Sequence, residues 1–79
     1  MNLYLISQTE KSDYNTYDSA VVAAESEYIA QRTLPYGGYI DEDQYEPSWV
    51  NNPQKVKVKL IGIAISGMAT GVICASFNA

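Results

Sequence analysis

Histidine is absent from this sequence, and cysteine occurs only once. The absence of histidine removes the commonest general base and metal ligand. One cysteine excludes an internal disulfide, and Cys74 lies within an apolar stretch, which favours a core position in a reducing compartment. The chain also lacks a phosphate-binding GK[ST] loop, a GxGxxG turn and a GxSxG elbow. We therefore expect no enzymatic activity, no metal site and no cofactor.

Charged side chains are missing from residues 60–79. An uncharged run of this length could cross a bilayer as a helix, and Gly67 and Gly71 have the spacing that packs membrane helices. The alternative is two buried strands joined by a turn, which would make Cys74 part of the core. The β-branched content of the run and the two glycines favour this second interpretation, a soluble chain that ends in a hairpin without a membrane partner.

The lysines just before this run support the strand interpretation. Lys55, Lys57 and Lys59 alternate with apolar residues, which is the period of a strand. Beyond Leu60 the bulky residues change to the odd positions. Either both faces of this strand are buried there, or a bulge near Gly62 shifts its register.

The size and the charge distribution restrict the class of protein. With 79 residues, of which 47% are hydrophobic and 18% charged, residues 1–79 are expected to form a single domain. No N-terminal signal is visible, so we expect a cytoplasmic protein. Residues 1–46 hold nine acids and two basic residues, a net charge of −7, and residues 47–79 hold three lysines, +3. This balance disfavours direct nucleic-acid binding and favours a basic protein surface as partner.

The remaining elements are predicted from local signals. Residues 1–8 and 19–24 are predicted strands, and Ser26 is a predicted N-cap of a helix that runs to about Leu34 and is ended by Pro35. The expected fold is α+β in the order ββαββ: a four-stranded antiparallel sheet with one short helix on one face.

Residues 36–54 form a predicted long loop that is rich in acids and aromatics. Tyrosine and tryptophan dominate binding hot spots, so we assign partner contacts to this loop and to the preceding turn. The assigned residues are Tyr14, Tyr17, Tyr36, Tyr39, Asp41, Glu42, Asp43, Tyr45, Glu46 and Trp49. Two other interpretations remain open: the acids form a solvated loop, and Trp49 folds back to cover the sheet. The acids lack the spacing of a calcium loop.

Lys55, Lys57 and Lys59 have two interpretations as well. They could bind phosphate groups of a nucleotide, or they could be solvated side chains that protect a sheet edge against aggregation.

Three stretches together resemble a group of small phage and prophage proteins of unknown function. They are MNLYLISQ at residues 1–8, YDSAVVAAESE at 17–27 and GVICASFNA at 71–79. The resemblance does not include the 36–54 loop, and it implies a phage context without an active site. By analogy, small acidic phage proteins often inhibit bacterial defence systems, as anti-CRISPR proteins do.

These observations predict a binding protein in the cytoplasm of an infected bacterium. Its acidic, tyrosine-bearing loops would occupy the basic, nucleic-acid-binding surface of a host protein or ribonucleoprotein defence complex. One alternative is an oligomer that sequesters a nucleotide immune signal between the lysines and stacked tyrosines. Another is a minor structural or assembly protein of the virion. Self-association is expected to supplement the small core of such a short chain.

Overall fold

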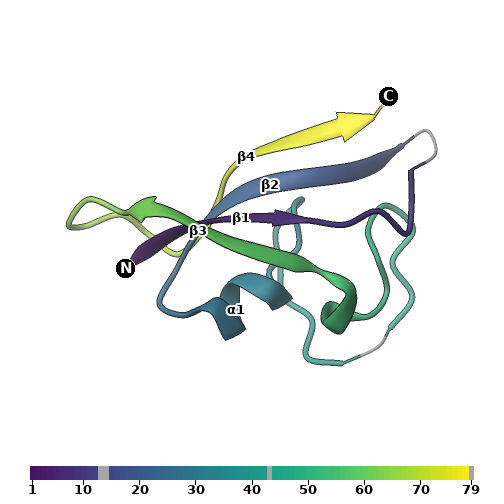
Figure 1. The fold of residues 1–79 in the computed structure, drawn as a ribbon, viewed down its shortest axis with the longest axis horizontal. Coiled ribbons are helices and arrows are strands. Elements are labelled where there is room, and N and C mark those ends of the chain that lie inside the picture. The colour runs from purple at the N-terminus through teal and green to yellow at the C-terminus, as the bar shows by residue number, and fades with distance from the viewer. Residues whose placement is uncertain (13–14, 43, 79) are drawn as a thin grey trace.

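A computed structural model describes residues 1–12, 15–42 and 44–78, which form one sheet, one α-helix and one 3₁₀ turn (Figure 1). In chain order the elements are β1 (Asn2–Ser7), β2 (Thr16–Ala24), α1 (Glu27–Arg32), η1 (Pro53–Lys55), β3 (Lys57–Ile63) and β4 (Gly71–Asn78). All neighbouring strands are antiparallel, in the order β3-β1-β2-β4, and α1 packs on one face. The predicted ββαββ α+β fold is therefore confirmed.

The last two strands do not form the predicted hairpin. β3 pairs with β1, β4 pairs with β2, and the two strands lie at opposite edges of the sheet. The connection between them passes the end of the central pair, with Gly67 at a φ of 89° and Gly71 at a φ of 143°. The side-chain pattern of a strand determines which face each residue takes, but it does not determine which strand becomes the neighbour. Within the described ranges, no helix has the length and apolar character that a membrane crossing requires.

The predicted bulge near Gly62 is confirmed. Leu3 is opposite Gly62 and Tyr4 is opposite Leu60, so Ile61 is the extra residue of β3. The competing prediction, burial on both faces, is wrong, because Leu60 is 59% and Ile63 is 79% exposed. The two edge strands extend beyond the area that the helix and the long loop cover.

Cys74 is exposed on β4, so its predicted place in the core is wrong as well. The pairing of Val21 with Cys74 puts both residues on the face opposite α1, together with Leu5. These side chains line a shallow hollow on that face. Figure 1 shows α1 and the long loop on the other side of the sheet, which leaves this face open.

The core lies between the sheet and the segment 30–56. The sheet contributes alternate residues of its two central strands, and the covering layer contributes apolar residues of α1 and of the long loop. The members of this core are Tyr4, Ile6, Ala20, Val22, Ala24, Ala30, Leu34, Ile40, Trp49, Val50 and Val56. The loop predicted as a binding element thus supplies a large share of the core, and its backbone path is fixed by that packing.

The helix begins as predicted and is shorter than predicted. The Ser26 hydroxyl accepts a hydrogen bond from the Ile29 amide at 3.3 Å, which satisfies one of the free donors of the first turn. Thr33 is already extended, and it forms an isolated bridge with Tyr39. Helical geometry therefore ends two residues before Leu34, because the chain reverses toward Tyr39.

Candidate functional site: an acid–tyrosine surface

The chain segment after α1 folds back along the helix. Leu34 donates to the Gly38 carbonyl at 3.0 Å, and Ile40 donates to the Arg32 carbonyl at 2.9 Å. Gly37 and Gly38 have φ values of 96° and 97°, a region that residues with a Cβ rarely adopt, and this permits the tight reversal. Tyr39 consequently lies beside the helix that carries Tyr28.

The Arg32 side chain is buried, and it contacts both Tyr28 and Gln31 of the helix. The Arg32 side chain is only 6% exposed, and its guanidinium carbon lies 3.6 Å from the centroid of the Tyr28 ring. Nη1 of Arg32 donates to the Tyr28 carbonyl and to Oε1 of Gln31, each at 3.1 Å. This stacking fixes the orientation of the Tyr28 ring, which remains 59% exposed.

Two tyrosines and two carboxylates therefore form one exposed surface. Tyr28 is 59% and Tyr39 is 47% exposed, Asp41 is exposed and acts on Tyr39, and Glu42 is exposed next to Asp41 in the chain. We call Tyr28, Tyr39, Asp41 and Glu42 the acid–tyrosine surface. Because Arg32 is buried beneath it, this surface presents phenol and carboxylate groups.

Partial desolvation and the neighbouring Asp41 carboxylate raise the pKa of Tyr39 above its ordinary value of 10.0. A side-chain hydrogen bond between Tyr39 and Asp41 raises the pKa further, so the phenol and the carboxylate are coupled within this surface.

The variant Asp41→Asn should lower the pKa of Tyr39 toward 10.0, because it removes a negative charge that opposes ionisation of the phenol. An NMR pH titration of the assigned tyrosine ring signals measures this shift. Glu42→Gln is the matched control, since Glu42 does not act on Tyr39. Equal shifts in the two variants, or no shift in Asp41→Asn, would contradict this arrangement.

A second aromatic group forms where the loop meets β2 and β4. The Tyr17 ring packs against those of Tyr36 and Phe77, with centroids 5.6 and 4.7 Å apart. The Tyr17 amide also donates to the Ser48 carbonyl at 2.9 Å, which holds the loop on β2. Tyr17 and Tyr36 are thus brought together as ring neighbours, and both rings contribute to packing.

Glu46 does not belong to an exposed acid cluster. It is only 9% exposed, and its carboxylate accepts hydrogen bonds from the Tyr36 hydroxyl and from Nε2 of Gln44. The assignment of Glu46 to the partner contacts is therefore corrected: its carboxylate binds the loop internally. The spacing of acids along a sequence does not show which of them turns inward.

Lys11 holds the same part of the loop from the other side. Its ammonium group donates to the Glu46 carbonyl and to Oδ1 of Asn51, the latter at 2.7 Å, and lies 5.1 Å from the centroid of the Tyr45 ring. Oδ1 of Asn51 also accepts from the Glu46 amide at 2.9 Å. Tyr45 is 76% exposed, and its ring contacts Lys11 of the same chain. No described contact joins Tyr45 to the acid–tyrosine surface.

Trp49 is fully buried, which confirms the interpretation that it covers the sheet. It is therefore not a contact residue. Asp43 and Tyr14 lie outside the described residues.

The three lysines do not form one stripe. Lys57 and Lys59 are opposite Ser7 and Leu5 of β1, which puts them on the open sheet face. Lys55 belongs to η1 and borders a separate hollow with Glu10, Lys11 and residues 50–52. The tyrosines of the long loop lie with the covering layer, on the other side of the sheet from Lys57 and Lys59.

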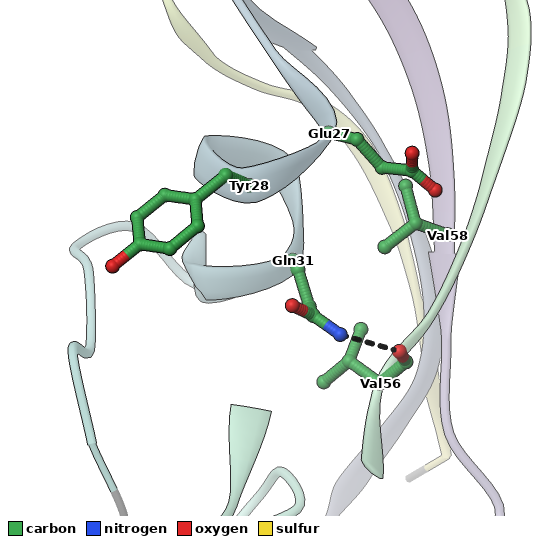
Figure 2. A pocket seen from close by; sticks show the side chains of 5 residues that line it. All are labelled: Glu27, Tyr28, Gln31, Val56 and Val58. Carbon is green, nitrogen blue, oxygen red and sulfur yellow. Dashed lines mark hydrogen bonds between the residues drawn. The ribbon is translucent and has the colours of Figure 1, made fainter. Parts of the chain in front are cut away.

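Tyr28 is a surface residue that the sequence interpretation missed. Its signal was available, because Tyr28 and Arg32 are four residues apart in the predicted helix and such residues meet on its surface. Tyr28 also borders a hollow between α1 and β3; in Figure 2 its ring extends to the side away from the two valines of this hollow, whereas Glu27 and Gln31 extend toward them. Val56 and Val58 form the apolar wall of this hollow, and Nε2 of Gln31 donates to the Val56 carbonyl at 3.4 Å.

Within residues 1–12, 15–42 and 44–78, no three acids or cysteines are grouped closely enough to hold a metal ion. Comparison of the chain with protein-family models, with curated proteins and with solved structures finds no match.

Proposed function

We propose that this protein functions by binding a cationic surface of a larger partner through its acid–tyrosine surface. The observation that carries the proposal is the meeting of Tyr28 and Tyr39 beside Asp41, with exposed Glu42 next in the chain and the local cation, Arg32, buried. By the resemblance to phage proteins, the proposed partner is a bacterial defence complex, of the kind that anti-CRISPR proteins inhibit. The surface that would be occupied is one that otherwise receives nucleic acid.

Charge and aromatic contacts would have different roles in such binding. The net charge of −4 would attract a basic partner over a distance and accelerate association, an effect that salt screens. Tyr28 and Tyr39 would supply affinity, because a tyrosine buries a large ring at little entropic cost. The stacking on Arg32 fixes the Tyr28 ring in advance, which reduces the ordering required on binding.

The hollow beside Tyr28 suits a cationic side chain from the partner. It has a volume of about 310 Å³ and combines the apolar Val56 and Val58 with the carboxylate of Glu27 (Figure 2). The aliphatic part of a lysine or arginine could pack on the valines while its charged end reaches Glu27.

The alternative of a nucleotide sponge requires lysines and tyrosines around one ligand. No contact among the described residues favours it within a single chain, since Lys57 and Lys59 lie on the face opposite the loop tyrosines. No described contact favours a role in the virion either.

The test is capture from bacterial host lysate with immobilised wild-type protein at low and high salt, followed by competition with nucleic acid. We expect a nucleic-acid-binding complex to be retained at low salt and displaced by RNA or DNA. Asp41→Asn/Glu42→Gln should slow association with the isolated complex by roughly tenfold. Tyr39→Ala should weaken binding by roughly 30-fold, as expected for a hot spot.

The matched control is Glu10→Gln/Asp18→Asn, which changes the net charge equally at two exposed acids outside the acid–tyrosine surface. This control variant should slow association clearly less than Asp41→Asn/Glu42→Gln does. Two results would argue against binding through this surface: retention of the partner that is the same at low and high salt, or an equal decrease of the association rate in both double variants.

A further inference from the structure

β4 is a sheet edge whose outer backbone groups have no neighbouring strand. It is last in the order β3-β1-β2-β4, and among the described residues it pairs with β2 alone. Such an edge presents a row of amide and carbonyl groups that can pair with another strand. The segment Cys74–Asn78 follows the bulge residue Ile73 without a further interruption on the β4 side.

The two edges of the sheet differ in their protection. Each edge strand has a bulge, at Ile61 in β3 and at Ile73 in β4, but only β3 also carries charges, Lys57 and Lys59, which discourage pairing with another chain. β4 contains no charged residue and no proline over its eight residues. Its side chains Ile73 and Phe77 are 49% and 45% exposed. β4 is therefore the edge that is open to a partner strand.

The charge of the chain favours a second copy as this partner. Residues 71–78, which form β4, bring no charge to an interface, so two copies can approach there without opposing like charges, although each has a net charge of −4. Figure 1 shows β4 at the edge of the sheet away from α1, so the acid–tyrosine surfaces remain outside this contact. An antiparallel strand pair across a two-fold axis is also self-complementary, since each copy offers the same donors and acceptors.

An interface through β4 has to cover enough surface on each copy to be stable. A stable interface takes about 800 Å² from each partner, roughly one-sixth of the 4696 Å² surface of this protein. On β4, the consecutive residues 73–77 are exposed and uncharged, so they are the surface that this edge can offer to a second copy.

We propose that two copies of this chain pair antiparallel through β4, which joins their sheets into one continuous eight-stranded sheet. The added strand pairing satisfies the open edge and covers Ile73 and Phe77. This inference is independent of the proposed function.

The experiment is sedimentation velocity over a wide range of protein concentration, supported by native mass spectrometry. Wild type should be a dimer. The double variant Ile73→Lys/Ser76→Lys should raise the dimer dissociation constant at least about tenfold, because each change acts twice in a symmetric interface and opposes like charges. Both positions are exposed, so circular dichroism should show an unchanged monomer fold.

The matched control is Leu60→Lys/Ile63→Lys, which adds the same charge at two exposed positions of the opposite edge and should leave the dimer intact. Disulfide crosslinking gives a second test, with three proteins that each have a single cysteine at position 74, 75 or 76. After oxidation, at least one of them should form a covalent dimer. The control Cys74→Ser/Lys59→Cys has its single cysteine on β3 and should not form a covalent dimer. A monomeric wild type would overturn the proposal. So would dissociation by the β3 double variant instead of the β4 double variant.

Discussion

The variant Trp49→Ala should lose about 3–5 kcal/mol of unfolding free energy, the usual range for removing a buried tryptophan side chain. Trp49 is fully buried and belongs to the same core cluster as Ile6, Val22 and Ile40. Small domains have a total unfolding free energy of about 5–15 kcal/mol, so this loss would leave the chain close to unfolding at room temperature. Urea unfolding followed by far-UV circular dichroism measures the effect without using tryptophan fluorescence.

Two variants separate core packing from general effects of aromatic loss. Trp49→Phe keeps part of the buried ring and should be less destabilising than Trp49→Ala. Tyr45→Ala removes a ring that is 76% exposed and whose described ring contact is with Lys11, so it should cost no more than about 1 kcal/mol. Similar losses for Trp49→Ala and Tyr45→Ala would contradict the assignment of Trp49 to the core.

The second large effect is expected at Lys11, whose removal should cost about 1.5–3 kcal/mol, as for hydrogen bonds to a charged group. Its ammonium group connects the turn between β1 and β2 to the long loop through the Glu46 carbonyl and Oδ1 of Asn51. Lys11→Ala leaves these acceptors without their donor. Urea unfolding gives the stability, and hydrogen exchange of the amides of residues 44–51 should become faster because the loop opens locally more often.

Lys11→Met is the matched control for the aliphatic part of the side chain. It keeps the apolar stem and removes the charge, so it should retain most of the loss seen in Lys11→Ala. If Lys11→Met behaves as wild type while Lys11→Ala is destabilised, packing of the stem would be the main contribution instead of the hydrogen bonds.

The corrections to the predicted site have a common cause. Glu46 was grouped with Asp41 because both are acids of one polar loop, yet Glu46 turns toward Tyr36 and Gln44. Tyr28 was assigned to no site, yet the reversal at Gly37 and Gly38 brings Tyr39 beside its helix. Both outcomes depend on how the chain returns to the sheet, which residue types along the loop do not specify.

Elements with a local cause were predictable. The alternation of Lys57, Val58 and Lys59 determines a strand, and Ser26 marks the start of the helix. The change of apolar parity beyond Leu60 left two interpretations, and one of them, a bulge near Gly62, is the one that Ile61 forms. These signals act over a few residues of backbone, so they do not depend on the tertiary contacts of the rest of the chain.

The sequence by itself determined the number and kind of elements, the two-layer α+β class and the uncharged character of the last quarter of the chain. Only the tertiary structure decided that β3 and β4 take opposite edges, that Cys74 is exposed, and that the acid–tyrosine surface forms around a buried Arg32. The physical reason is that strand order and loop placement depend on contacts between residues far apart in the chain. Several arrangements satisfy the same local pattern, and the choice among them depends on how well the whole core packs.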